Sequence, residues 1–312
     1  MNEFARDSRD ESGFVSYDVA TLGESMVMVA PVRPERLTHA IDLQLEVGGA
    51  ESNVALHLAK LGHRVSWTGR LGDDPFGQRV LRTIAAGRVD TSSAVLDPLG
   101  HTGVYFKDPH PTGTRVHYYR ADSAASRMNP ELLGSIPIAF SRIVHLTGIT
   151  PALSASCADL IDAVIDEAHR VGTAVSFDVN YRHALWPVDR AAAALERLIR
   201  QSDIVFVGRD EAETVWGTTT AEQIHSRFPA PGRLVVKDGD IGATEFFGQS
   251  VAFVPSLPVD VVEVVGAGDA FAAGYLSALL HGQNGEPALA RGHSIAAEVL
   301  TTMADFNPGS PQ

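Results

Sequence analysis

Residues 142–180 read RIVHLTGITPALSASCADLIDAVIDEAHRVGTAVSFDVN, and this stretch determines the class of the fold. RIVHLTGI and TAVSFDVN are short apolar runs typical of buried strands. Between them, apolar residues recur at helical spacing and stop at Gly172, a typical helix end; they are Leu160, Ile161, Val164, Ile165 and Ala168. The stretch therefore predicts a strand, a helix and a second strand.

The same unit repeats toward the C-terminus. A helix at 189–201 (DRAAAALERLIRQ) precedes a strand at 203–207 (DIVFV), and a helix opening near Asp210 precedes a strand at 233–237 (RLVVK). Repeated strand–helix units predict an α/β fold with a doubly wound, mostly parallel sheet and helices on both faces. Ligands of such sheets bind beyond the carboxyl ends of the strands, where this sequence has Asp178, Asn180 and Lys237.

The first third of the chain has a different pattern. Leu43, Leu45 and Val47 alternate with polar residues, and residues 101–126 resemble a hairpin around Pro111-Thr112-Gly113. Alternation is typical of a half-exposed sheet, so we expect a small β lid made from insertions at about 30–49 and 100–125. The expected domain spans 18–306, between a flexible N-terminal tail (1–17) and a C-terminal tail (307–312).

Composition excludes several classes of protein. The net charge of −13 over 312 residues, without a basic patch, argues against nucleic-acid binding. Cys157 is the only cysteine, which excludes an intrachain disulfide and a CxxC metal site. No apolar run approaches the ~20 residues that span a bilayer, and the polar N-terminus does not resemble a signal peptide. We therefore expect a cytoplasmic protein with no membrane partner.

VVGAGDAF, residues 264–271, combines two glycines, the start of an apolar helix and one carboxylate. Backbone N–H groups at a helix start bind anions such as phosphate, and Asp269 beside them could accept a proton from an attacking hydroxyl. Phosphoryl transfer needs both features. The alternative interpretation is a tight turn capped by an aspartate. Because the chain contains no GxxxxGK[ST] motif, a P-loop enzyme is not expected.

A second glycine-containing stretch, VGGAESNVALHLAKLG, spans residues 47–62. The glycine pair would let backbone amides approach a hydroxylated ligand, while Asn53 bonds its hydroxyl groups. The alternative is an ordinary loop followed by a capped helix.

Together the two stretches resemble the signatures of the ribokinase-like (PfkB-type) carbohydrate kinases, and the resemblance extends from about Asp18 to about Met303. It implies a doubly wound domain with a β lid, ATP and Mg²⁺ as cofactors, and transfer of the γ-phosphoryl group to a sugar hydroxyl. By position, Asp269 would be the catalytic base, and the anion hole would be formed by Gly266, Ala267 and Gly268.

The lid segments resemble those of the 2-keto-3-deoxygluconate kinases within this family. Two arginines suit a substrate carboxylate, which a guanidinium group binds in a bidentate manner. The resemblance assigns sugar binding to Gly49, Asn53, Tyr105, Tyr118, Arg120 and Arg182. Alternatively, Arg120 is a solvated strand residue, and Arg182 pairs with Asp178 or Glu211. The sequence is also compatible with a kinase for a neutral sugar such as fructose or ribose, or with a catalytically weak sugar-binding regulator.

On the nucleotide side, residues 237–242 resemble the family's KxGxxG turn, which would place Lys237, Gly239 and Gly242 near ATP. An ordinary glycine turn is the alternative. Glu211 would act on the metal through water, or serve only as a helix N-terminal acid. Relatives usually have Asp-Thr or Asp-Pro before GAGD, where this chain has Glu263-Val264, so binding of a monovalent cation stays open. The resemblance also implies a homodimer or higher homo-oligomer paired through the lids.

Overall fold

The computed structural model describes residues 16–110, 113–229 and 231–302, which exclude the predicted C-terminal tail and nearly all of the predicted N-terminal tail. An eight-stranded sheet with strand order β14-β13-β12-β11-β10-β9-β1-β4 forms its centre. All neighbours pair in parallel except β13 and β14, which extend one edge antiparallel. The strands are β1 (Tyr17–Leu22), β4 (Val65–Thr68), β9 (Ser141–Thr147), β10 (Ala174–Asp178), β11 (Ile204–Gly208), β12 (Arg233–Asp238), β13 (Gly242–Phe247) and β14 (Ser250–Pro255).

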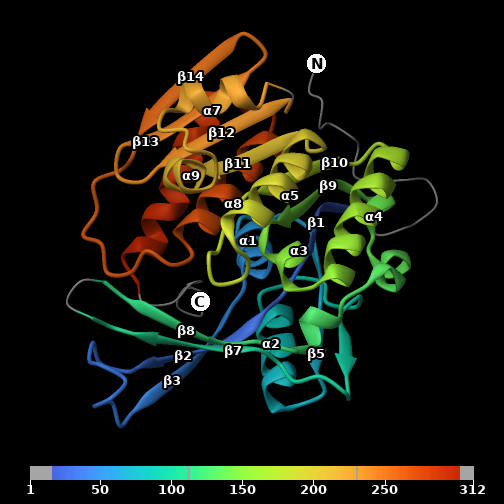
Figure 1. Ribbon diagram of the computed structural model, residues 1–312, viewed down its shortest axis with the longest axis vertical. Coiled ribbons are helices and arrows are strands. Elements are labelled where there is room, and N and C mark those ends of the chain that lie inside the picture. Colours follow the sequence, from blue (N-terminus) through green and yellow to red (C-terminus); the bar gives the residue numbers. More distant parts are fainter. Residues whose placement is uncertain (1–15, 111–112, 230, 303–312) are drawn as a thin grey trace.

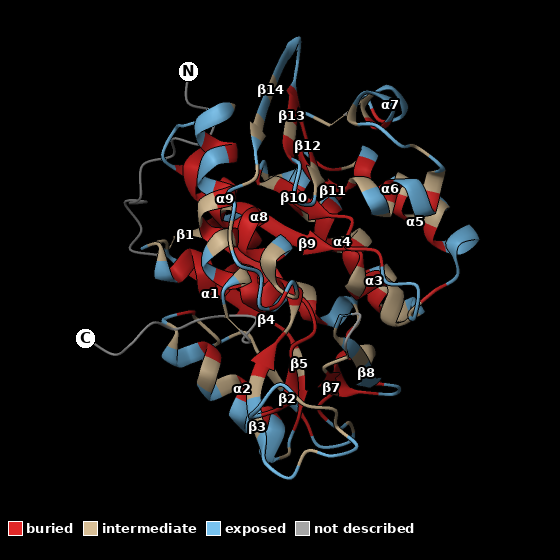
Figure 2. Cartoon of the chain, turned by 90° about the vertical axis from the view of Figure 1, so that its left-hand side faces the viewer, coloured by how far each residue is buried: buried red, intermediate tan, exposed pale blue. Residues whose placement is uncertain are grey.

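Helices cover both faces of this sheet, as the sequence predicts, and Figure 2 shows them on opposite sides of the buried strands. One core joins the sheet to α4–α7, and the other joins it to α1, α8 and α9. The helices are α1 (Ala50–Lys60), α2 (Pro75–Ala86), α3 (Ile149–Leu153), α4 (Ala155–Val171), α5 (Val188–Arg200), α6 (Arg209–Trp216), α7 (Ala221–Arg227), α8 (Ala267–Leu280) and α9 (Glu286–Leu300). None of the described helices combines the length and apolar character needed to cross a membrane.

The predicted strand–helix–strand unit is present as β9, α4 and β10. The five apolar residues of α4 on which the prediction rests are all fully buried. Gly172 ends the helix in the left-handed conformation (φ 75°), and the Ser154 side chain accepts a hydrogen bond from the Cys157 N–H at its start. Local pattern and tertiary burial therefore agree in this half of the chain.

A separate four-stranded sheet with order β3-β2-β7-β8 lies along the lower edge of the molecule in Figure 1, and we call it the lid sheet. Its strands are β2 (Met26–Pro31), β3 (Leu43–Gly48), β7 (Val104–Asp108) and β8 (Arg115–Tyr119). β7 and β8 pair antiparallel, as expected of the predicted hairpin, whose turn residues Pro111 and Thr112 lie outside the described residues. The lid sheet also includes β2, which begins at Met26, before the first predicted insertion at about 30–49.

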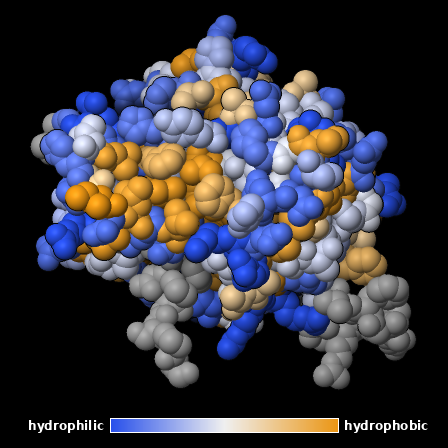
Figure 3. Space-filling view, turned by 90° about the horizontal axis from the view of Figure 1, so that it is seen from below, coloured by the Kyte–Doolittle hydropathy of each residue, from blue (hydrophilic) through white to orange (hydrophobic). Residues whose placement is uncertain are grey.

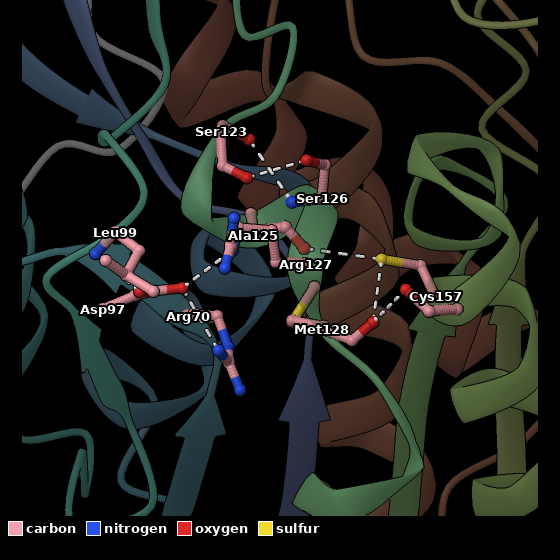
Figure 4. A network of polar contacts seen from close by, with 10 residues as sticks. Arg70, Asp97, Leu99, Ser123, Ala125, Ser126, Arg127, Met128 and Cys157 are labelled. Carbon is pink, nitrogen blue, oxygen red and sulfur yellow. Dashed lines mark hydrogen bonds and ion pairs between the residues drawn. The ribbon is translucent and has the colours of Figure 1, made fainter.

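A polar network fastens the segment that follows the lid to the main domain (Figure 4). Asp97 ends the short strand β6 (Val95–Asp97), which pairs with β5 (Arg70–Gly72). Its Oδ2 accepts hydrogen bonds from Arg70 and Arg127, at 3.2 and 3.1 Å. The buried Cys157 thiol lies 3.4 Å from the Ala125 carbonyl oxygen. The 3₁₀ turns here are Ala124–Arg127, Pro130–Ser135 and Ile138–Phe140.

Candidate active site

The N-terminus of α8 opens the candidate site. Gly266 caps it at φ 85°, in the left-handed region that side chains rarely adopt, and the helix begins at Ala267. The GAGD residues therefore form the cap and the first turn of α8. Such a helix start directs unpaired N–H groups toward one point, where an anion can bind.

Asp269, in the first turn of α8, lies at the centre of a set of polar side chains. Its Oδ2 accepts a hydrogen bond from the Asn53 Nδ2 of α1 at 2.9 Å, and its Oδ1 accepts a longer one from the Asn180 Nδ2 at 3.5 Å. Asn180 follows β10 in a left-handed conformation (φ 40°), which turns the chain at the strand end. The structure thus joins the two sequence signatures, which are 216 residues apart, through one hydrogen bond.

The pKa of Asp269 is raised to about 7. Burial is the main cause, because it disfavours the charged carboxylate, and the nearby Asp178 adds to the rise. The hydrogen bond from Asn53 and the charges of Arg182 and Lys237 oppose it. A carboxyl group with a pKa near neutrality can both take and return a proton at physiological pH, as a general base requires.

A lysine–aspartate pair lies next to Asp269 at the carboxyl ends of two strands. The Lys237 Nζ at the end of β12 donates to the Asp178 Oδ2 at the end of β10, at 2.7 Å. Burial disfavours the lysine charge, but Asp178 and Glu211 outweigh it and the pKa of Lys237 is raised. The same Nζ lies 3.5 Å from the position that a β-carbon on Gly268 would occupy, so a fixed positive charge lies over the α8 turn.

Glu211 is a further, half-buried charge on this edge. It is in the first turn of α6, and its Oε2 accepts a hydrogen bond from the Gly208 N–H at 2.9 Å, which caps the helix. Burial raises its pKa against the opposing charge of Lys237. Among the described residues, no cluster of three or more His, Cys, Asp or Glu side chains could hold a metal by itself.

The diglycine turn lies directly before α1, which begins at Ala50. A side chain at Gly49 would lie 2.4 Å from the Glu24 carbonyl oxygen, so only glycine allows α1 to cross the β1–β2 connection this closely. Glu51, in the first turn of α1, is fully buried, and its Oε1 accepts hydrogen bonds from the Thr147 and Thr150 hydroxyls. Burial raises the pKa of Glu51 to about 7.

The predicted lid residues lie together at one end of the lid sheet. The rings of Tyr105 and Tyr118 pair across β7 and β8, with centroids 5.7 Å apart, and the Arg120 guanidinium lies over the Tyr118 ring. Arg120 is buried and forms an ion pair with Glu24, whose Oε1 also accepts from the Ser123 hydroxyl at 2.9 Å. The interpretation of Arg120 as a solvated strand residue is therefore wrong.

Arg182 lies in the segment that follows β10. Its side chain is exposed, and its Nη1 donates to the neighbouring Tyr181 carbonyl at 3.4 Å. Its charge opposes the rise in the pKa of both Asp269 and Glu211, which places it near the buried carboxylates. Gly239 and Gly242 lie in the hairpin between β12 and β13, directly after Lys237.

Comparison with known proteins gives a family for this geometry. The model of the pfkB family of carbohydrate kinases matches residues 17–311. The chain belongs to the pfkB family of carbohydrate kinases. It is 35% identical over 297 residues to the 2-dehydro-3-deoxygluconokinase of Bacillus subtilis, covering 93% of this chain and 91% of the relative.

Two further relatives of this pfkB kinase cover nearly the whole chain. The 2-dehydro-3-deoxygalactonokinase of Haloferax volcanii is 31% identical over 300 residues, with 94% of each chain covered. The crystal structure of a PfkB protein from Polaromonas sp. JS666 is 35% identical with a TM-score of 0.84, over 93% of this chain and 98% of that chain. The chain is therefore a carbohydrate kinase with the ribokinase-like fold that its sequence predicts.

Several buried residues of this pfkB kinase site were not identified from sequence. The sequence marks Asp178 and Asn180 only as residues at strand ends, and it does not indicate a role for Glu24 or Glu51. Glu51 precedes Ser52 and Asn53 in the GGAESN segment, where an acid at a helix start is ordinarily solvated. Only the three-dimensional contacts with Thr147, Thr150 and Gly23 show that it is buried.

Proposed function

We propose that this carbohydrate kinase transfers the γ-phosphoryl group of ATP to the terminal hydroxyl of 2-keto-3-deoxygluconate, giving the 6-phosphate. The carrying observation is the placement of Asp269: a carboxyl group with a pKa of about 7, held by Asn53 in the first turn of a helix that begins with a glycine turn. Glu51 and Glu211 also have raised pKa values in the first turn of a helix, but of these three carboxylates only Asp269 follows a glycine in the left-handed conformation.

In the proposed mechanism Asp269 acts as the base. Its ionised carboxylate accepts the proton of the substrate's terminal hydroxyl, while that oxygen bonds to the γ-phosphorus and the bond to the leaving ADP breaks. The N–H groups of the Gly266–Gly268 turn and the ammonium of Lys237 stabilise the charge on the transferring group. Because Asn53 and Asn180 donate to Asp269, they fix the direction in which the carboxylate faces the acceptor.

The residues around Lys237 fit Mg²⁺ carried in by ATP. The Asp178 Oδ1 and the Asn180 Oδ1 are buried oxygens without a hydrogen-bond partner, and Mg²⁺ prefers oxygen ligands. With only a few side-chain oxygens available, the phosphates and waters would have to complete its coordination. When bound, Mg²⁺ supplies charge neutralisation for the phosphates; Glu211 would hold an ordered water near it. The proposal leaves open whether the enzyme also binds a monovalent cation.

The substrate proposal rests on the relatives' names and on two arginines. The Bacillus subtilis and Haloferax volcanii relatives are named as kinases of 2-dehydro-3-deoxygluconate and 2-dehydro-3-deoxygalactonate. 2-Dehydro-3-deoxygluconate is another name for 2-keto-3-deoxygluconate. Arg182 is exposed beside the proposed base, where its guanidinium can bind a carboxylate. Tyr105 and Tyr118 offer ring surface and hydroxyl groups from the lid sheet, next to Arg120. The backbone at Gly49, directly before α1, would contact the sugar from the other signature.

A substrate panel tests the proposal directly. With ATP and Mg²⁺, ADP release should be fastest with 2-keto-3-deoxygluconate or its galactonate epimer and much slower with fructose and ribose. The position of the new phosphate can be read by NMR. Preference for fructose would favour a neutral-sugar kinase, and sugar binding without ADP release would favour a regulator. Either result would contradict the proposal.

We further propose that the enzyme is a dimer joined through its lid sheets. One face of the lid sheet carries a large apolar area, visible in Figure 3 on the side where Figure 1 places these strands. Leu43, Leu45 and Tyr119 are exposed on this face. Exposed apolar areas of this kind usually mark protein interfaces. Light scattering should give a dimer mass, and Leu45→Lys should give a monomer; a monomeric wild-type protein would contradict this part of the proposal.

A further inference from the structure

A buried ion pair connects the lid sheet to the segment before the α8 turn. The Lys107 Nζ on β7 lies 3.7 Å from the Glu263 Oε2, and both side chains are almost completely buried. Lys107 follows Tyr105 by two residues along β7, so both side chains point from the same face of the lid sheet. Glu263 and Val264 occupy the positions where the family usually has Asp-Thr or Asp-Pro.

Glu263 also shapes the turn that leads into α8. Its Oε1 accepts hydrogen bonds from the N–H groups of Val264 and Val265, at 2.8 and 3.3 Å. The Val262 N–H donates to the Leu300 carbonyl at the end of α9, and the Ala267 N–H donates to the Val264 carbonyl. The Glu263 carboxylate therefore holds the backbone of the segment that ends at Gly266 through hydrogen bonds.

This position creates an electrostatic conflict with the proposed function. Glu263 is three residues before Gly266, so its Cα lies within about 11 Å of the Gly266 Cα, even along an extended chain. A buried negative charge at that distance is poorly screened and repels a triphosphate. A counter-charge beside it removes most of that repulsion, and the lid lysine provides one.

We propose that Lys107 is a positioning residue: it neutralises Glu263 and thereby lets the α8 turn accept the phosphates of Mg-ATP while the lid sheet is in place. The proposal rests on the nucleotide site of the proposed function and extends it, because a lid residue would then control nucleotide affinity through Glu263 without touching the nucleotide. Strand β7 would then act on both substrates, because Tyr105 contacts the sugar and Lys107 controls the affinity for Mg-ATP.

Direct binding measurements test this separately from turnover. Calorimetric titration with Mg-ATP is compared for the wild-type protein, Lys107→Met, Glu263→Gln and the double variant, with the melting temperature of each. Lys107→Met should weaken Mg-ATP binding at least about tenfold, because it leaves a buried carboxylate without its partner. Glu263→Gln keeps an oxygen that can accept from Val264 and Val265, and the double variant should bind within about threefold of Glu263→Gln.

Controls and contrary outcomes are well defined. Lys60→Met, which removes a lysine from the exposed pair with Glu298, should leave Mg-ATP binding unchanged, and Lys107→Arg should retain most of it. Equal binding by wild-type and Lys107→Met would overturn the inference alone. So would a double variant that binds tenfold more weakly than Glu263→Gln, a comparison that holds even if Lys107→Met fails to fold. A wild-type protein that does not bind Mg-ATP would overturn the proposed function and this inference with it.

Discussion

Glu51 and Asp269 can be compared directly, because burial raises the pKa of both carboxyl groups while their hydrogen-bond partners differ. Each lies in the first turn of a helix, α1 or α8, and each carboxyl has a pKa raised to about 7 by burial. Glu51 is held by two threonine hydroxyls and packs against Gly23. Asp269 instead receives two asparagine amides, and two cationic side chains lie near it.

The difference teaches that a raised pKa alone does not identify a catalytic acid or base. Glu51 is completely buried, and it connects α1 to the end of β9 and to the connection into the lid sheet. Asp269 keeps 9% of its surface exposed, next to a turn suited to anions. We therefore interpret Glu51 as a structural carboxyl and Asp269 as the reactive one.

The strongest test of this comparison exchanges each acid for its amide. Asp269→Asn should lower kcat by about 10²–10⁴-fold, because the amide cannot take the hydroxyl proton. Glu51→Gln, which keeps an oxygen for Thr147 and Thr150, should change kcat far less. Steady-state assays of ADP release measure both, and full activity of Asp269→Asn would exclude it as the base.

Removal of the nearby cation should sharpen the comparison further. Arg182→Ala should raise the KM for the keto-acid by about 10–100-fold, the usual value of a charge-assisted hydrogen bond. Because Arg182 opposes the rise in the pKa of Asp269, the acidic limb of the kcat/KM profile should also move to higher pH. Arg190→Ala on the exposed side of α5 is the matched control. An unchanged KM would mean that Arg182 does not bind the substrate carboxylate.

The smallest predicted effect concerns stability as a function of pH. The folded pKa of Glu51 is above its ordinary value, so its stabilising contribution is complete below about pH 4.5 and is lost as pH rises through about 7. Glu51→Gln should therefore raise Tm at pH 8.5 by several degrees, for a gain of at most about 3 kcal/mol, with little effect at pH 4.5.

Thermal melts across this pH range measure the effect, with the exposed Asp166→Asn as control. A Glu51→Gln variant less stable than wild type at pH 8.5 would show that the ionised carboxylate is stabilising. Asp269→Asn should also raise Tm at high pH, but it should lose activity. The effect of a buried carboxyl on stability would then be separated from its effect on catalysis.

Local patterns were sufficient to predict much of this molecule. The apolar spacing of α4 and the β-branched runs on either side of it decide the parallel sheet, since each element's burial follows its own periodicity. β2 could not be assigned to the lid sheet in this way, because MVMVAP is apolar throughout and is buried at every position. Its partners, β3 and β7, are set by tertiary pairing.

The candidate site divides in the same way. Asp269, Asn53 and Lys237 occur in recognisable glycine-containing segments, and the structure brings all three to one edge of the sheet. The buried partners Glu24 and Glu51 occur in segments where acids are usually solvated, so their burial depends on contacts with distant parts of the chain. Which arginine has a carboxylate partner is likewise a matter of tertiary contact: Arg120 has Glu24, and the structure leaves Arg182 exposed.

The pairing of Arg120 with Glu24 has a consequence for selectivity. Under the proposed function, the carboxylate of a sugar acid must replace the buried Glu24 carboxylate as the partner of the Arg120 guanidinium. The net gain is then the difference between two carboxylate complexes, and a ligand without a negative charge gains nothing from the exchange. Discrimination between sugar acids and neutral sugars at Arg120 then depends on how much better the substrate carboxylate binds this guanidinium than Glu24 does.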